Sequence, residues 1–224
     1  YNSLGYRDVE PAVAQSSENL VIVVGDSYVW GDGIARYEDT ISALLRKHLD
    51  KLAPGRYVVM SAAYPGLGVY GYLKALEKLV PEFRPNVVVV GYLGRADLDP
   101  LDAQRIIDLV PGGGSFDGVF QVLGVLATLH ESKIGFGEGM DDVREKLMTY
   151  LENFAKAGKR SILIDYFGDG QRTAGIEVVS LPEPWRYRGR SELWYGKDIH
   201  PKPSLNRLLA GLLADRIVNG HAQR

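Results

Sequence analysis

The 224-residue chain contains no cysteine, which excludes disulfide bonds, thiolate metal ligands and a cysteine nucleophile. It also lacks an excess of charge of either sign, because the formal net charge is -2 and the basic residues are scattered along the sequence. Binding to a phosphate backbone requires a dense stripe of Lys and Arg. We therefore expect no nucleic-acid partner, while the missing cysteine leaves the compartment open.

Long uninterrupted apolar runs are also missing. Stretches such as VFQVLGVLATL are too short or too broken to cross a bilayer, so we expect no membrane segment in this chain. Because the sequence begins at Tyr1 rather than Met, an upstream signal or membrane anchor stays open as an expectation. Extracytoplasmic, membrane-anchored and cytoplasmic locations are all left open, and so is the oligomeric state.

What the sequence does contain is a regular alternation of buried strands and amphipathic helices. Hydrophobic residues make up 46% of the chain, enough to bury one sizeable core, and we expect a single α/β domain over residues 1–224. Continuous apolar strands between helices predict a parallel sheet covered on both faces. The predicted strands are 20–24, 56–62, 86–93, 160–167 and 175–181, and the predicted helices are 39–52, 72–80, 141–158 and 203–220.

One stretch does not follow this alternation. Residues from about 98 to 140, with PGGG at 111–114 and GFGEGM at 135–140, have the character of an insertion with one or two short helices. In open α/β folds, ligands bind at the edge of the sheet where the strands end. We expect the insertion to lie over that edge.

The first candidate site follows the first predicted strand, in VIVVGDSYVWGDG at 21–33. Gly25, Asp26 and Ser27 leave the carboxyl end of that strand, so the Ser27 hydroxyl is expected at the ligand-binding edge, in a position that suits a nucleophile. The alternative is that Gly-Asp-Ser ends the strand with turn-forming residues and has no further role.

A second feature near the other end of the chain supports the nucleophile. Asp198 precedes His200 by two residues, in a loop before the last predicted helix. An acid so close can hold the Nδ1–H of the imidazole and leave Nε2 free to take a proton from a serine hydroxyl. Ser27, Asp198 and His200 would then form a triad. The other histidines, His48, His130 and His221, lack this arrangement and are expected to be solvated or packed.

These residues carry a resemblance to a known family. GDSYVWGDG after an apolar strand and KDIHPKPSLNRLLAGLLADRI near the end resemble the first and last sequence blocks of the SGNH/GDSL hydrolase superfamily, and SAAYPGLGVYGY at 61–72 resembles its second block. NSLGYRD at 2–8 resembles the lead-in of one branch. The resemblance implies a three-layer αβα sandwich with a central parallel sheet, similar to flavodoxin, and ester hydrolysis or acyl transfer by a serine nucleophile. It also implies an oxyanion hole built from the N–H groups of Ser27 and Gly66 and an asparagine side chain.

The third block departs from the family pattern. Where Gly-x-Asn-Asp is expected, the sequence reads GRADLD at 94–99, which puts Ala96 or Arg95 at the asparagine position. Loss of one oxyanion donor typically costs about 10²–10³ in turnover. Three explanations stay open: Arg95 supplies the donor, the enzyme works slowly with two backbone donors, or the chain has become a glycan-binding module.

Other chemistries are less well supported. Asp26, Asp32, Asp97 and Asp99 could converge on a hard cation, but no second histidine stands in a suitable place, so we expect no metal. A Gly-x-Gly-x-x-Gly phosphate turn is also missing, which argues against a dinucleotide. We expect no cofactor.

The substrate is predicted from the side chains around the expected site. Aromatic faces suit sugar rings and acyl chains, and the residues expected to bind substrate are Asp26, Tyr28, Trp30, Tyr64 and Trp194. We predict a serine esterase that removes a small O-acyl group, acetyl being favoured, from a carbohydrate or another ester. An O-acyltransferase with the same triad is the alternative enzyme.

Overall fold

The computed structural model describes residues 1–10, 19–93, 140–166, 174–181, 191–195 and 200–220. Its centre is a five-stranded parallel sheet with the strand order β2-β1-β3-β4-β5. The strands are β1 (Leu20–Gly25), β2 (Val58–Ala63), β3 (Val87–Tyr92), β4 (Arg160–Asp165) and β5 (Ile176–Ser180). This is the flavodoxin-like order, in which the chain moves outward in opposite directions from β1.

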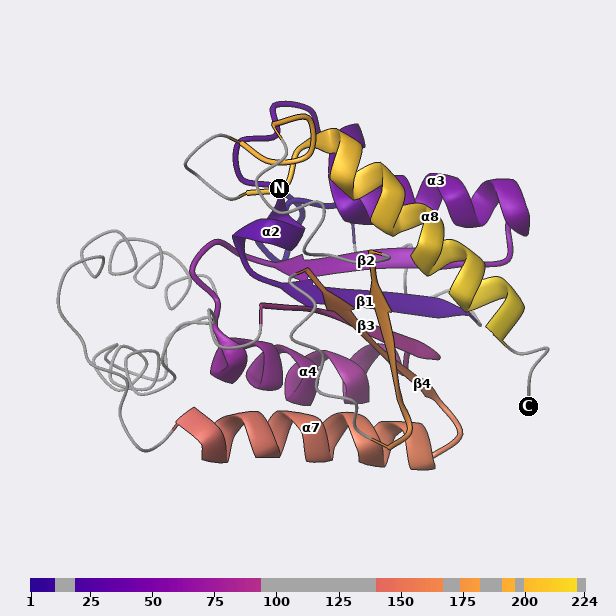
Figure 1. Cartoon of the computed structure of the whole chain (residues 1–224). Coiled ribbons are helices and arrows are strands. Elements are labelled where there is room, and N and C mark those ends of the chain that lie inside the picture. Colours follow the sequence, from indigo (N-terminus) through magenta and orange to yellow (C-terminus); the bar gives the residue numbers. More distant parts are fainter. Residues whose placement is uncertain (11–18, 94–139, 167–173, 182–190, 196–199, 221–224) are drawn as a thin grey trace, which may run out of the picture.

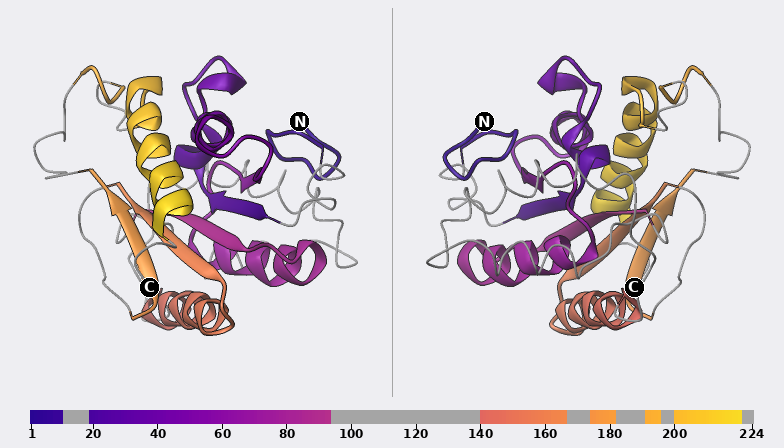
Figure 2. Two further views of the ribbon diagram at one scale, coloured as in Figure 1. Left: turned by 90° about the vertical axis from the view of Figure 1, so that its right-hand side faces the viewer. Right: turned by 90° about the vertical axis from the view of Figure 1, so that its left-hand side faces the viewer.

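Two layers of helices cover the sheet (Figures 1 and 2). On one face lie α3 (Ile41–Leu52) and α8 (Pro203–Asn219), which pack against each other, and on the other face lie α4 (Val69–Phe83) and α7 (Met140–Lys156). Alternate residues of β1 serve the two layers, because Ile22 packs on the α4 side and Val23 on the α3 side. The three-layer αβα sandwich predicted from the sequence is therefore confirmed.

Strands β1, β3 and β4 are buried along their whole length and β2 along most of it, which explains why apolar runs predicted them so well, whereas β5 is partly half-buried. Predicted and observed bounds differ by at most three residues. The largest difference is in α4, which begins at Val69 instead of residue 72 and ends at Phe83 instead of residue 80, with Arg84 in a left-handed conformation at φ 49°. Gly158 stands two residues after the end of α7 with φ 79°, as expected for a helix stop.

Two short elements had no sequence prediction: α2 (Ser27–Trp30) and the 3₁₀ turn η1 (Tyr37–Asp39). Both are too short for a periodic hydrophobic pattern. The insertion expected at about 98–140 lies outside the described residues, apart from Met140 at the start of α7. The prediction of one domain over 1–224 stays a prediction.

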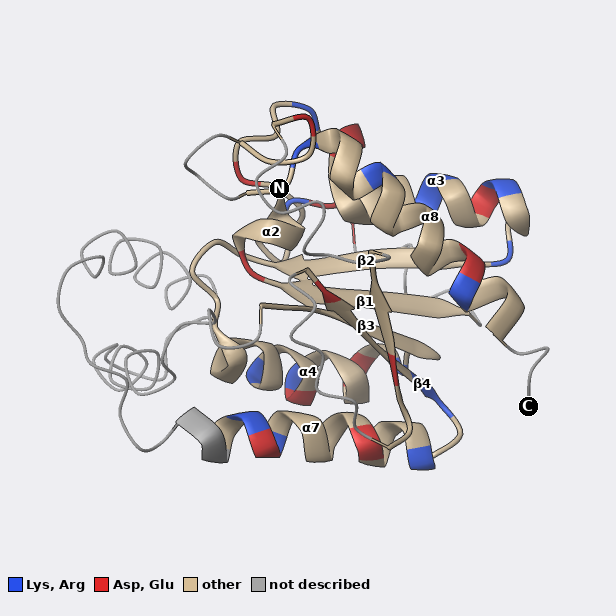
Figure 3. Ribbon diagram, viewed as in Figure 1, with Lys and Arg blue, Asp and Glu red and all other residues tan. Residues whose placement is uncertain are grey.

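Charged side chains of both signs are interspersed along the helices (Figure 3). On α4, for example, Lys74 and Glu77 form an ion pair. None of the helices within the described ranges combines the length and the apolar character that crossing a bilayer requires.

Candidate active site

The short helix α2 places Ser27 at the carboxyl edge of the sheet, beside the position where the strand order reverses between β1 and β3 (Figure 1). Asp26 caps this helix, because its carboxylate accepts a hydrogen bond of 2.9 Å from the Tyr28 backbone N–H. Asp26 is buried, whereas Ser27 is half-exposed. The acid before the serine therefore fixes the start of α2 and leaves the hydroxyl accessible.

Glycines at the ends of two neighbouring strands hold α2 close to the sheet. A Cβ atom at Gly25 of β1 or at Gly91 of β3 would lie 2.3 Å from Cγ2 of Val29, well inside van der Waals contact. Val29 is buried, so its methyl group fills the space that both missing side chains leave. The depth at which the Ser27 helix rests on the sheet is set by these two glycines.

His200 lies directly beside Ser27, with Nε2 2.8 Å from Ser27 Oγ, although 173 positions separate the two residues in the sequence. Backbone hydrogen bonds join the residues before the segment 196–199 to the residues after it. Tyr195 N–H donates to the His200 carbonyl at 3.0 Å, and Lys202 N–H donates to the Leu193 carbonyl at 2.7 Å. This pairing fixes the histidine three residues before α8 begins at Pro203.

A cluster of buried aromatic rings supports the histidine. The Tyr28 ring lies 5.0 Å from the His200 ring between centroids, 5.1 Å from Tyr166 and 6.3 Å from Trp194, the last two in edge-on arrangements. Tyr28, Tyr166 and Trp194 are each almost fully buried. Burial raises the pKa of Tyr166 well above its usual range, and the nearby Asp26 and Tyr28 add to the effect.

The loop after β2 contains the Gly66 expected in the oxyanion hole. Tyr64 N–H donates to the Gly25 carbonyl, and Leu67 N–H donates to the Tyr64 carbonyl, both at 3.1 Å. Pro65 and Gly66 are the central residues of this turn, and Gly66 has φ 81°. Proline followed by a glycine of positive φ is typical of a type II turn. The turn is thus hydrogen-bonded to Gly25, two residues before Ser27.

The N-terminal segment anchors the same region, a role that no pattern in the sequence predicts. The Arg7 guanidinium donates to the carbonyls of Gly31 at 3.1 Å and Ile34 at 2.8 Å, just after α2, and stacks over the Trp30 ring at 5.0 Å. Arg7 therefore satisfies carbonyl groups at the end of the Ser27 helix. The only sequence signal for these contacts of Arg7 was the resemblance of NSLGYRD to the lead-in of one family branch, and that resemblance gives Arg7 no role.

Asp8, in the same segment, is buried in a polar network. Its carboxylate accepts hydrogen bonds from Ser61 N–H in β2, from the Tyr37 hydroxyl, and from Arg46 at 2.8 Å. Its side chain is fully buried, and the hydrogen bonds supply the compensation that a buried charge needs. Burial raises the pKa of Tyr37 to about 12. The segment is thereby attached to β2, α3 and η1.

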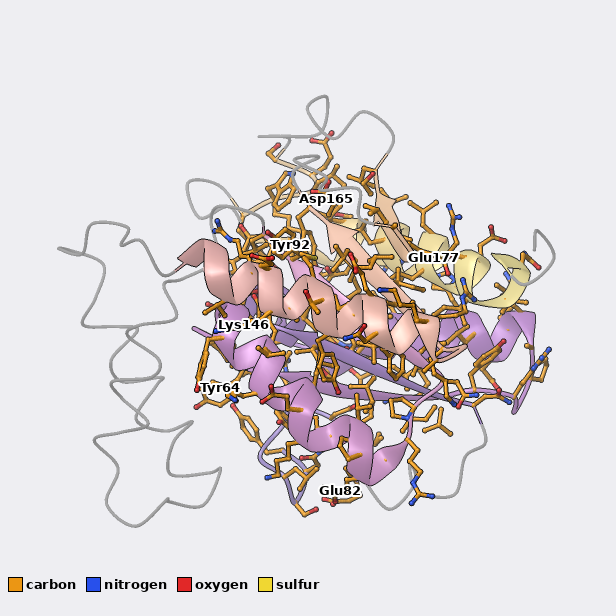
Figure 4. The ribbon with its side chains drawn as sticks, turned by 90° about the horizontal axis from the view of Figure 1, so that it is seen from below. Tyr64, Glu82, Tyr92, Lys146, Asp165 and Glu177 are labelled. Carbon is orange, nitrogen blue, oxygen red and sulfur yellow. The ribbon has the colours of Figure 1, made fainter. Side chains whose placement is uncertain are left out.

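The remaining predicted residues have different outcomes. Asp198, Arg95 and Ala96 lie outside the described residues, as do Asp97 and Asp99. Trp30 lies beneath Arg7, and Tyr64 is half-buried at the edge of the sheet where β2 ends (Figure 4). The described residues contain no group of three or more acidic or histidine side chains that could hold a metal. The assignment of Asp26, Tyr28, Trp30, Tyr64 and Trp194 to substrate binding stays a prediction.

No family model matches the chain, and no curated protein matches it either. Solved structures do. The psychrotrophic esterase EstA from Pseudoalteromonas sp., inhibited by monoethylphosphonate, aligns over 92% of this chain and 100% of its own, with 16% identity and a TM-score of 0.56. An acetyl xylan esterase, AlAXEase, aligns over 89% of this chain and 100% of its own, with 15% identity and a TM-score of 0.54. A protein described as a GDSL-like lipase from Parabacteroides merdae aligns over 88% and 94%, with 14% identity and a TM-score of 0.51.

The chain has the fold of these esterases. This is the fold that the resemblance to the SGNH/GDSL hydrolases implied, so the expected fold class is confirmed. At 14–16% identity the likeness concerns the fold, and the activity of this chain has to be argued from its own site.

Proposed function

We propose that the protein is a serine esterase that removes a small O-acyl group, acetyl being favoured, from a carbohydrate or another polyhydroxy alcohol. The observation that carries this proposal is the 2.8 Å distance between Ser27 Oγ and His200 Nε2. A serine hydroxyl attacks an ester at neutral pH only when a neighbouring base takes its proton. In the tautomer with a proton on Nδ1, His200 is that base.

The reaction takes two steps in this arrangement. Ser27 Oγ attacks the carbonyl carbon as His200 Nε2 accepts its proton, and the resulting imidazolium then protonates the departing alcohol to leave an acyl-serine. Water attacks the acyl-serine in the same way, His200 again taking and returning the proton, which releases the acid and the free serine. Backbone N–H groups of Ser27 and Gly66 are the proposed donors to the tetrahedral oxyanion.

The proposed roles of the other residues follow from position. Asp198 would accept the Nδ1–H of His200 and keep the imidazole in the required tautomer. Arg95 and Ala96 occupy the stretch where the family has its asparagine donor. The acetyl group and the carbohydrate are proposed because AlAXEase, which shares the fold, is an acetyl xylan esterase.

The proposal is tested by hydrolysis of an activated ester, p-nitrophenyl acetate, followed by a set of acetylated glycans with release of acetate as the readout. Ser27→Ala is expected to abolish turnover, whereas Ser191→Ala, which removes an exposed serine from the described surface, should leave it unchanged. Equal turnover by wild type and Ser27→Ala would rule out the nucleophile. Absence of turnover in wild type, together with binding of a glycan, would favour the glycan-binding alternative.

A further inference from the structure

A second carboxylate, Asp32, faces the reacting nitrogen of His200. Asp32 Oδ2 lies 3.9 Å from His200 Nε2, on the nitrogen that also contacts Ser27 Oγ. The carboxylate proposed to orient the imidazole acts at the opposite ring nitrogen, Nδ1, so Asp32 does not duplicate it. The Asp32 side chain is 51% exposed and that of His200 19%, which leaves Asp32 open to an incoming molecule.

The position of Asp32 is fixed by the backbone around it. Its N–H donates to the Ser27 carbonyl at 2.9 Å, and its Oδ1 accepts from Gly33 N–H at 3.0 Å. The Tyr195 ring, from the His200 loop, touches Gly33 so closely that a Cβ atom there would lie 3.2 Å from it. The carboxylate is therefore held in one place relative to both Ser27 and His200 before any substrate arrives, as a selective contact requires.

The chemistry of the reaction says which part of the substrate comes near Asp32. His200 Nε2 must protonate the departing alcohol oxygen, so that oxygen has to lie within hydrogen-bond reach of Nε2. Asp32 Oδ2 is 3.9 Å from the same nitrogen. It therefore faces the alcohol half of the ester, at the distance of a group attached one carbon away from the departing oxygen.

We propose that Asp32 is a specificity-determining residue that accepts a hydrogen bond from a hydroxyl group next to the ester in the alcohol half of the substrate. This inference rests on the proposed esterase function and narrows it to esters of neutral polyols. A carboxylate accepts hydrogen bonds and donates none, so it favours a vicinal hydroxyl and repels a vicinal carboxylate. Esters of simple alcohols are predicted to react more slowly, and esters of hydroxy acids more slowly still.

Three acetyl esters that differ only in the alcohol test this proposal: 1-acetylglycerol, propyl acetate and O-acetyl-lactate. For wild type we expect kcat/KM to be about 10-fold higher for 1-acetylglycerol than for propyl acetate, the range that a charged hydrogen bond supplies at a half-exposed site. Asp32→Ala should remove most of this preference. Asp32→Asn keeps an acceptor oxygen but not the charge, so it should retain part of the preference and lose the discrimination against O-acetyl-lactate.

Glu82→Gln is the matched control, since Glu82 is an exposed acid near the end of α4, on the other face of the sheet (Figure 4). Its selectivity ratios should equal those of wild type. Unchanged ratios in both Asp32 variants would overturn the proposal. So would an equal fall for all three esters, because Asp32 would then act through His200 and not on the substrate. If wild type cleaves neither these esters nor p-nitrophenyl acetate, the proposed esterase function is wrong. If wild type cleaves them but the Asp32 variants have the same selectivity ratios as wild type, only the role of Asp32 is wrong.

Discussion

Cγ2 of Val29 packs against Gly91 so closely that a Cβ atom at Gly91 would lie only 2.3 Å from it. Gly91 belongs to β3 and Val29 to α2, so a single methyl group joins the sheet to the helix that carries Ser27. A nucleophile works only if its position relative to its base stays within about 0.5 Å of the productive geometry. The contact links a packing requirement to the geometry of the site.

Gly91→Ala should therefore displace α2. We expect the substitution to lower the free energy of unfolding by about 1–3 kcal/mol, as overpacking does, and to lower esterase turnover as well. Val29→Ala in the same chain makes room for the new methyl group and should recover part of both losses. Thermal unfolding and kcat of the two single variants and the double variant check this.

Gly211→Ala is the control for that series. Gly211 lies in α8, has no close neighbour except a His48 atom at 3.8 Å, and should gain up to about 1 kcal/mol because alanine favours a helix. If Gly91→Ala were as harmless as Gly211→Ala, the packing of α2 against the glycines would not matter to the site.

The acid of the proposed triad gives a second prediction. Asp198→Asn should lower turnover by about 10⁴, because an amide at this position favours the wrong imidazole tautomer, while the fold is unaffected. Glu192→Gln, which changes an exposed acid in the segment leading to the same loop, should have little effect. If Glu192→Gln lowered turnover strongly and Asp198→Asn did not, Asp198 would not be the acid of the triad.

Much of the fold could be predicted from the sequence, because the central strands β1 and β3 are buried on both faces and are unbroken apolar runs in the sequence. Ser27 and His200 could be singled out because each stands in a recognisable motif. The strand order could not be read from the runs themselves, since they do not say which strands are neighbours. The contacts of Arg7, Asp32 and Gly91 were missed for a similar reason: each depends on a partner from another element, and no local pattern marks it.

The buried hydroxyl of Tyr166 leads to a pH prediction. Among the described residues it has no hydrogen-bond partner, and burial raises its pKa well above the usual value of about 10. Above pH 10 the unfolded chain loses this proton and the folded protein keeps it, so the stability contributed by the protonated group declines as the pH rises. Tyr166→Phe should make the free energy of unfolding fall less steeply above pH 10.

At pH 8 the same variant should be more stable by about 1 kcal/mol, because an unpaired buried hydroxyl has been removed. Chemical denaturation at pH 8 and at pH 10.5 measures both effects. Some alkaline loss will remain, since the pKa of Tyr37 is also raised, to about 12. Tyr1→Phe, which removes an exposed hydroxyl, is the control. A steeper alkaline loss in Tyr166→Phe would contradict this account.

The departure from the family in GRADLD gives a further prediction. If Ala96 stands at the place of a missing amide donor, Ala96→Asn should raise kcat, by up to about 10² when the local backbone already has the required shape. If Arg95 has replaced that donor, Arg95→Ala should lower kcat and Ala96→Asn should gain nothing. Initial rates with p-nitrophenyl acetate distinguish the two cases. No change in either variant would mean that this stretch does not supply an oxyanion donor.

The central claim is that His200 activates Ser27 as a nucleophile, and covalent labelling tests it most directly. A p-nitrophenyl alkylphosphonate transfers its phosphonyl group only to an activated serine, with release of nitrophenol, and the adduct is read by intact mass and peptide mapping. We predict one adduct per chain, on Ser27, lost in Ser27→Ala, strongly slowed in His200→Ala and unaffected in Ser191→Ala. An unlabelled wild-type chain, or an adduct on another serine, would contradict the account.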